Sequence, residues 1–192
     1  MKINYVTSKT LKKECFKAAM LKRMPALFFN DIVESAIFYG RRGGKFDKDQ
    51  CKREGFNLTP MPDSQAGTIV AKPGDMSVVV LSKKPLAGFV SELMNHLVQV
   101  FQSRGLNAKK DNNDILIDDR KIFGGSAVRH RGIYYAGMFF AMNNNEELVA
   151  RICAQEQRVK LAAGLSDDYG MDKQYIIDAI CVFANNWNET YD

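Results

Sequence analysis

The segment from Asn113 to Arg131, NDILIDDRKIFGGSAVRHR, constrains the fold more than any other part of the chain. Apolar residues alternate with polar ones at three isoleucines, and two aspartates interrupt the alternation at positions 118 and 119. This pattern predicts a β-hairpin with its turn at the aspartates. The run Gly124-Gly125-Ser126-Ala127 follows and predicts a flexible loop that exposes its backbone, with Lys121 between the turn and this loop.

The same segment resembles the lysine-bearing segment of the superfamily that contains lipoate ligases, octanoyltransferases and biotin ligases. The family pattern is Asn-Asp, apolar residues, Asp-Gly-Arg-Lys-Ile and then a run of small residues. Two departures occur, because Asp119 replaces the turn glycine and Phe123-Gly124 adds a residue before Ser126. The matching positions are Asn113, Asp114, Ile115, Leu116, Asp118, Arg120, Lys121, Ile122, Gly125, Ser126 and Ala127.

The resemblance implies a catalytic role for Lys121, whose ammonium would hold an acyl carbonyl or an acyl-adenylate phosphate. Without the family match, a solvent-facing lysine after a hairpin turn is the simpler interpretation. An active ligase would use ATP with Mg²⁺ and lipoate, octanoate or biotin, and its partner would be a lipoyl- or biotinyl-carrier domain. The implied binding residues are Gly40, Arg41, Gly67, Lys72, Gly74, Asn113, Asp114, Gly124, Gly125, Ser126 and Ala127.

A second stretch resembles the glycine-rich half of the family motif. Lys72-Pro73-Gly74 fits the family's turn, and the segment 77–81 fits the strand after it. However, Met61-Pro62 stands at the arginine positions, Gln65-Ala66-Gly67 at the glycine triplet and Ala71 at the histidine. These losses support an alternative function, in which an inactive member of the fold is a protein- or nucleic-acid-binding module.

The cluster Gly40-Arg41-Arg42-Gly43-Gly44-Lys45 follows a predicted strand. Glycines let backbone amides approach an anion and arginines offer forked donors, so the cluster could bind phosphate. It lacks the spacing of a Walker loop, and a solvated basic turn explains it equally well. The family often places Gly-Arg after this strand, and Gly40-Arg41 occupies that place.

The composition is that of an ordinary globular protein. The 192 residues are 46% hydrophobic and 26% charged, which suits one domain with a sizeable core. No apolar run approaches the ~20 residues of a membrane span, and the lysine-rich N-terminus lacks the apolar core of a signal peptide. A cytoplasmic location is therefore expected. The net charge of +5 favours anionic partners, including nucleotides, acidic carrier domains and nucleic acid.

The periodicity of the remaining chain predicts an α+β fold, with a mixed or antiparallel sheet and helices packed mostly on one face. We expect a single domain over 1–192, with an N-terminal helical segment at 1–25 and a C-terminal helical segment at 161–192. Gly132 to Met142 should form a central core strand. Strands are expected at 26–29, 36–39 and 77–81, and helices at 9–22, 46–54, 85–103, 146–160 and 172–187.

Other reactive side chains are interpreted as structural. Four cysteines without CxxC spacing and only two histidines indicate neither a zinc site nor a disulfide framework, so reduced thiols are expected. Cys153 lies near the family's nucleophilic cysteine, but its helical, apolar context favours an inert core thiol. His96 is expected at a helix surface or interface. The cluster at 129–131 could meet phosphates or remain solvated.

Overall fold

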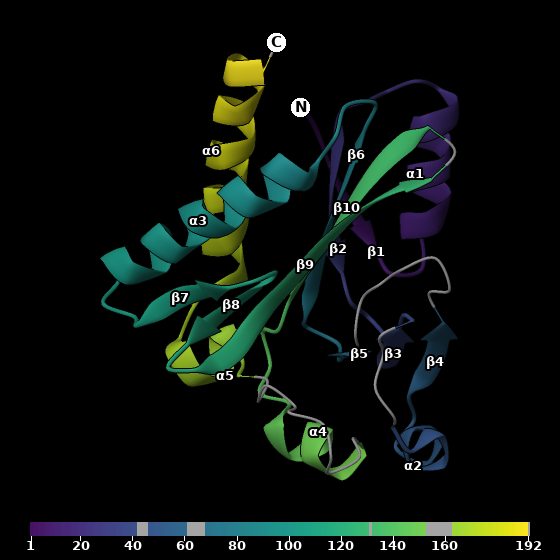
Figure 1. Cartoon of the computed structure of the whole chain (residues 1–192). Helices are drawn as coiled ribbons and strands as arrows, with labels where there is room; N and C mark the ends of the chain where they lie inside the picture. Colours follow the sequence, from purple (N-terminus) through teal and green to yellow (C-terminus); the bar gives the residue numbers. More distant parts are fainter. Residues whose placement is uncertain (42–45, 61–67, 131, 153–162, 192) are drawn as a thin grey trace.

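The computed structural model describes residues 1–41, 46–60, 68–130, 132–152 and 163–191, and it contains two β-sheets (Figure 1). The larger sheet has seven strands in the order β1-β2-β6-β10-β9-β8-β7, and the smaller has the order β4-β3-β5. The seven strands are β1 (Lys2–Thr7), β2 (Ala26–Asp31), β6 (Met76–Ser82), β7 (Ala108–Asp111), β8 (Asp114–Ile117), β9 (Arg120–His130) and β10 (Ile133–Phe140). The smaller sheet comprises β3 (Ala36–Tyr39), β4 (Asn57–Pro60) and β5 (Thr68–Ala71).

The larger sheet is mixed, as the sequence predicts. Only its β1–β2 pair is parallel, and all other neighbours are antiparallel. Strand β10 is the middle strand and pairs with β6 on one side and β9 on the other. The prediction that the aromatic segment forms a central strand is therefore confirmed.

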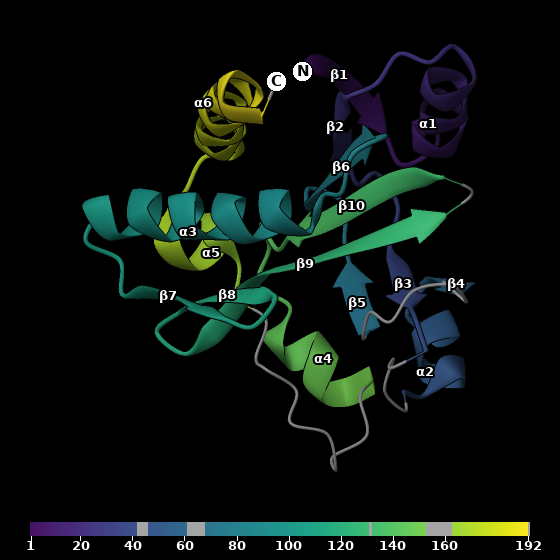
Figure 2. The same ribbon diagram turned by 45° about the horizontal axis from the view of Figure 1, so that its top comes forward.

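Helices cover the two faces of this sheet unequally (Figures 1 and 2). The main core lies on the face covered by α3 (Ala87–Ser103) and α6 (Lys173–Tyr191), and it includes Leu27 and Phe29 of β2. On the opposite face, α1 (Leu11–Met20) packs over Ala26 and Phe28. The alternation of side chains along β2 thus sends successive residues to different helices. This arrangement agrees with helices mostly on one face.

Helix α3 forms because its apolar residues recur at intervals of three and four. Phe89, Leu93 and Leu97 are fully buried, and each stabilises the fold by about 1.5 to 3 kcal/mol through burial. The helix ends before Gly105, which adopts a φ of +79°. On the same helix, the Nε2 of His96 lies 3.2 Å from the carbonyl oxygen of Ala179 in α6, so the interfacial assignment of this histidine is confirmed.

The smaller sheet has its own apolar cluster with α2 (Lys48–Arg53) and α4 (Glu146–Ile152). Asp47 caps α2, because its Oδ1 accepts hydrogen bonds from the backbone amides of Asp49 and Gln50. Ile37 of β3 packs in one cluster with Ile152 of α4. Since α4 follows β10 in the chain, this cluster ties the smaller sheet to the end of the larger one.

Several sequence-based predictions need correction. Residues 2–7 form strand β1 and not part of a helical segment. Strand β4 was not predicted and ends at Pro60, where its edge position in the smaller sheet tolerates a missing amide hydrogen. Within the described part of the segment expected at 161–192, a short helix, α5 (Leu165–Tyr169), precedes α6. The helix expected at 146–160 is present as far as Ile152, and its remaining residues lie outside the described part.

The largest correction concerns Gly124-Gly125-Ser126-Ala127. These residues form no loop but lie inside β9, a strand of eleven residues. Each of them is aligned with a residue of β10, from Gly124 opposite Phe139 to Ala127 opposite Ala136. The pairing with β10 holds these residues in an extended conformation, which glycines do not favour by themselves. No helix within the described ranges is long and apolar enough to cross a membrane.

Candidate functional site

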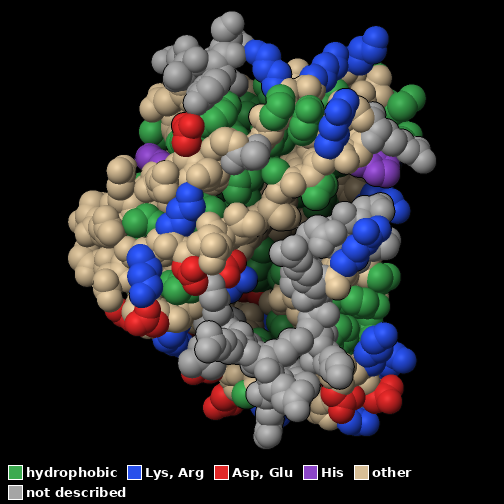
Figure 3. All heavy atoms as spheres, viewed as in Figure 1, with side chains coloured by type: hydrophobic (Ala, Val, Ile, Leu, Met, Phe, Trp, Pro, Cys, Tyr) green, Lys and Arg blue, Asp and Glu red, His purple; other side chains and the backbone are tan. Residues whose placement is uncertain are grey.

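A groove of about 900 Å³ lies on the α1 face of the larger sheet, and strands of the smaller sheet line its other side. Figure 3 shows the surface hollowed between the two sheets. Its floor comes from β2, β6, β10 and β9, and its rim includes the start of α1. Seven of the binding or catalytic residues predicted from the sequence line it, namely Asn113, Asp114, Lys121, Gly124, Gly125, Ser126 and Ala127.

Lys121 and Asp114 form an ion pair at one end of this groove. The Lys121 Nζ lies 2.9 Å from the Asp114 Oδ1, and the two side chains are 35% and 20% exposed. A β-carbon on Gly124 would lie 3.1 Å from the Nζ and 3.2 Å from the Oδ1. The absence of a side chain at Gly124 therefore makes room for the pair above the strand.

An irregularity in β9 explains how Lys121 faces the groove. Asp114 is aligned with Gly124 and Ile115 with Phe123, but Leu116 is aligned with Lys121, so Ile122 is an extra residue. Such a bulge re-aims the side chains on either side of it. It puts Lys121 and Gly124 on the same face of β9.

The turn before Lys121 is the two-residue turn that the sequence predicts. Asp118 and Asp119 adopt φ angles of 49° and 63°, and they connect Ile117 to Arg120 across the hairpin. Left-handed conformations at both positions match the twist of paired strands. Aspartate tolerates this conformation at a cost that glycine avoids.

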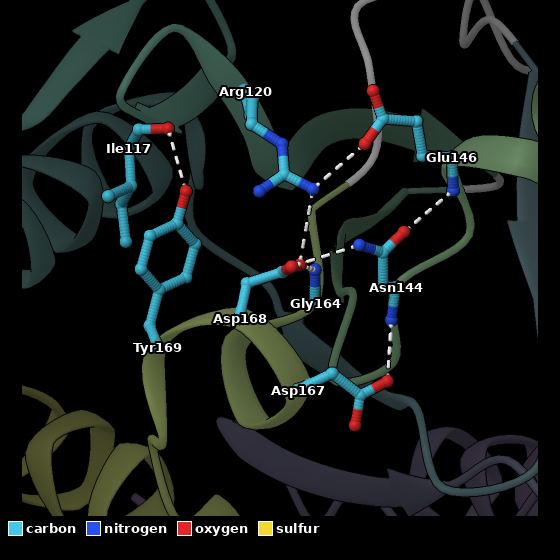
Figure 4. A network of polar contacts seen from close by, with 8 residues as sticks. All are labelled: Ile117, Arg120, Asn144, Glu146, Gly164, Asp167, Asp168 and Tyr169. Atoms are coloured by element: carbon cyan, nitrogen blue, oxygen red, sulfur yellow. Dashed lines mark hydrogen bonds and ion pairs between the residues drawn. The ribbon is translucent and has the colours of Figure 1, made fainter.

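A polar network connects the β8–β9 hairpin to α4 and α5 (Figure 4). The Arg120 guanidinium donates to Glu146 at 3.0 Å and to Asp168 at 3.3 Å. Asp168 also accepts from the backbone amide of Gly164 at 2.7 Å and from the side chain of Asn144 at 2.9 Å. Lys121 thus follows a residue that is anchored to two helices, α4 and α5.

The electrostatics of this network favour its ionised form. Burial acts to raise the pKa of Asp168, but the hydrogen bonds from Gly164 and Asn144 and the charge of Arg120 outweigh it and lower that pKa. Burial raises the pKa of Tyr169, whose hydroxyl donates to the carbonyl of Ile117 at 3.1 Å. Tyr169 therefore stays protonated and ties the end of β8 to α5.

The other predicted binding residues lie elsewhere. Gly40 directly follows β3 and Arg41 is exposed beyond it, while Lys72 and Gly74 belong to the turn between β5 and β6. None of these four is among the described residues that line the groove. Gly67 lies outside the described residues, as do Arg42 to Lys45, Arg131 and Cys153.

The turn with Lys72 and Gly74 is organised around Asp75, which is fully buried. The Asp75 carboxylate accepts from the backbone amides of Lys72, Met142 and Asn143 and from the Asn143 side chain, at 2.8 to 3.0 Å. Burial raises the pKa of Asp75, and these four donors oppose the rise. The sequence analysis missed this residue, although an aspartate directly after Pro-Gly is a recognisable turn signal.

Sequence reasoning also missed the groove floor. Asn30, Ser77 and Gly137 line the groove from three adjacent strands. A β-carbon on Gly137 would meet no atom within 4 Å, so the floor is open there. In the sequence, Asn30 is recognisable only as a polar residue directly after the apolar run 26–29.

Two further reactive groups have structural explanations. Cys15 lines the groove, and burial together with the charge of Glu14 raises its pKa to about 11, so the thiol is protonated at neutral pH. The Arg129 guanidinium lies 5.5 Å from the ring centre of Tyr134 on the neighbouring strand. No cluster of three or more residues suited to a metal ion occurs in the described part of the chain.

Comparison with known proteins agrees with this geometry. Residues 5–169 match the family model of the lipoyl protein ligase A/B catalytic domain, and the chain belongs to this family. No match was found among curated proteins.

Solved structures share the fold at low sequence identity. P. falciparum LipL1 in complex with lipoate has a TM-score of 0.77 and 13% identity, covering 100% of this chain and 63% of its own. The bi-partite lipoate protein ligase of Thermoplasma acidophilum, described with its E2 lipoyl domain, has a TM-score of 0.71 and 16% identity over 95% and 81%. Lipoate-protein ligase A bound with ATP has 0.71 and 15% over 95% and 84%. This chain therefore spans less than two thirds of LipL1 and has a lipoate ligase-like catalytic fold.

Proposed function

We propose that this protein binds an acyl group as its adenylate in the groove beside Lys121 and transfers it to a lysine of a carrier domain. The observation that carries the proposal is the groove that Lys121, Asp114 and the small residues of β9 line together. The proteins of similar fold include one in complex with lipoate, one bound with ATP and one with its E2 lipoyl domain. These ligands and this partner are the classes we propose here.

In the transfer step, the carrier amine attacks the acyl carbonyl, a carbon–nitrogen bond forms and the carbon–oxygen bond to AMP breaks. The amine loses its proton, and AMP leaves with the bonding electrons. The Lys121 ammonium, which faces the groove, would stabilise the negative charge that develops on the acyl oxygen and the leaving phosphate. This contribution requires Lys121 to exchange part of its contact with Asp114 for the substrate.

Formation of the adenylate from a free acid would consume ATP with Mg²⁺. Magnesium is commonly held by one or two carboxylates together with substrate phosphates. Asp114 offers a carboxylate beside Lys121, and Asn113 next to it also lines the groove. These residues fit such a site, whereas an all-protein metal cage is absent from the described residues. A transferase would instead receive its acyl group from an acyl carrier donor.

The proposal is tested by isothermal titration with lipoyl-AMP, octanoyl-AMP and biotinyl-AMP. We expect at least one of them to bind, and we expect Lys121→Ala to weaken its binding about 10- to 100-fold through loss of a charged hydrogen bond. Lys110→Ala is the matched control. It removes the same charge from the same sheet, but Lys110 bonds Ser91 of α3 and does not line the groove. Absence of binding by all three ligands contradicts the proposal.

A further inference from the structure

A buried polar side chain, that of Asn30 on β2, lies in the groove floor three strands away from Lys121 on β9, and it is 2% exposed. Along β2, Ala26 and Phe28 pack on the α1 side, whereas Leu27 and Phe29 enter the core under α3. Asn30 continues the first series and therefore lies on the groove face of the sheet. On this face of β2, the two earlier positions are apolar, whereas the third is the polar Asn30.

The hydrogen bonding of Asn30 is incomplete. Its Nδ2 donates to the Oγ of Ser77 at 2.7 Å, and Ser77 also lines the groove. Its Oδ1 is buried and has no hydrogen-bond partner among the described residues. Within the described residues, only the amino group of the Asn30 side chain is hydrogen-bonded. A buried acceptor without a partner is costly, so its presence in a groove wall indicates a ligand that supplies the donor.

Strand register relates Asn30 to Lys121. Asn30 is aligned with Ser77, Ser77 with Phe139 and Phe139 with Gly124, above which the Lys121 Nζ lies. Three strand spacings of about 4.8 Å separate β2 from β9, which gives about 14 Å. An extended acyl chain of about nine atoms, with a hydrogen bond of about 2.8 Å at each end, covers this distance. A medium-length acyl group with its carbonyl at Lys121 therefore brings its far end to Asn30.

The surroundings of Asn30 make a hydrogen bond there selective. Leu11, Ile32 and Val79 line the same groove with apolar side chains. A donor that enters this region leaves water and is compensated only by a buried acceptor. Sites that hydrogen-bond a substrate in this way discriminate strongly against analogues without the donor.

We propose that Asn30 reads a hydrogen-bond donor at the distal end of the acyl group. The substrate class is then a medium-length acyl chain that ends in a hydroxyl, amide or ureido N–H group, in preference to a plain hydrocarbon chain. This inference rests on the proposed function, because it takes the carbonyl end to be held at Lys121.

Three non-hydrolysable acyl-sulfamoyl adenosines test the inference by titration calorimetry. They carry an octanoyl, an ω-hydroxyoctanoyl or an ω-methoxyoctanoyl chain, and the methoxy oxygen accepts but cannot donate. We expect the hydroxy analogue to bind about 10- to 100-fold more tightly than the other two. Equal affinity for all three, or tightest binding of the methoxy analogue, overturns the role of Asn30 while the proposed function stands. Failure of all three to bind overturns this inference, whereas the proposed function falls only if lipoyl-AMP and biotinyl-AMP also fail to bind.

Asn30→Leu sharpens the test, because leucine has a similar volume and no polar atoms. The variant should lose the preference for the hydroxy analogue and keep its affinity for the octanoyl analogue. Asn57→Leu is the matched control, since Asn57 also lines the groove but is exposed and bonds Glu34. Its preference should equal that of the wild type. A preference that persists in Asn30→Leu contradicts the assignment, and the retained octanoyl binding shows that the variant is folded.

Discussion

The β8–β9 hairpin and the turn between β5 and β6 contain the same three residue types with opposite roles. In the hairpin, Asp114, Lys121 and Gly124 line the groove, and the carboxylate faces a partly exposed ammonium. In the turn, Asp75 is fully buried and takes its hydrogen bonds from three backbone amides and one side chain. The partners of a carboxylate, more than the motif around it, therefore distinguish a binding group from a structural one.

Removal of the Asp75 carboxylate should have the largest effect on stability. Asp75→Ala leaves four N–H donors without their acceptor and should lower the free energy of unfolding by about 3 kcal/mol or more. Asp75→Asn keeps one acceptor oxygen and should lose about half as much. Urea unfolding measures both. Asp178→Asn, at an exposed position of α6, is the control and should change stability by less than about 0.5 kcal/mol. An Asp75→Ala variant with unchanged stability would contradict the structural role of Asp75.

Gly124→Val should act on binding. Its side chain would displace Lys121 and Asp114, whose Nζ and Oδ1 lie 3.1 and 3.2 Å from the β-carbon position. We expect about a tenfold loss of acyl-adenylate affinity, or about 1.4 kcal/mol. Gly137→Ala adds bulk to the same floor where no atom lies within 4 Å, so calorimetry should show a much smaller loss. Equal losses in the two variants would mean that bulk, and not the position of Lys121, determines binding.

The Arg120 network should contribute about 1 kcal/mol, because its groups are partly exposed. The lowered pKa of Asp168 means that its contribution is present above the ordinary aspartate pKa of about 4 and is lost as pH falls through the folded value. Thermal unfolding of the wild type and Asp168→Asn between pH 7 and pH 2 measures this contribution. The difference in melting temperature should shrink below about pH 4. A constant difference across this range contradicts the ionised network.

The smallest expected effect is a gain in stability at the hairpin turn. Asp119→Gly relieves the left-handed conformation at a φ of 63° and should stabilise the protein by about 0.5 to 1 kcal/mol, although it removes the ion pair with Lys109. Asp49→Gly makes the same change inside α2 and should destabilise by a similar amount. Chemical unfolding of both variants measures whether each change raises or lowers the free energy of unfolding. A loss of stability in Asp119→Gly would show that the ion pair outweighs the strain.

Local patterns in the sequence predicted much of the fold. Alternation and the paired aspartates predicted the hairpin, and the apolar period predicted α3 and α6. The glycine-rich run was misread as a loop because its order comes from pairing with β10, which no local pattern encodes. Strand β1 was missed for a similar reason, since it depends on parallel pairing with β2.

The candidate site was predicted only where it is local in sequence. Asn113, Asp114 and Lys121 lie within nine residues of one another, and the family pattern identified them. Asn30 and Gly137 join them only through the strand order of the folded sheet, so the floor of the groove could not be read from the chain.

We have proposed that the groove beside Lys121 holds an acyl group for transfer. The most direct measurement is the intact mass of a lipoyl carrier domain after incubation with this protein, ATP, Mg²⁺ and lipoate, and separately with preformed lipoyl-AMP and octanoyl-AMP. We expect a carrier that gains one acyl group on its lysine with at least one adenylate, and a loss of most of this product with Lys121→Ala but not with Lys110→Ala. An unmodified carrier under all of these conditions, or full product with Lys121→Ala, contradicts this proposal.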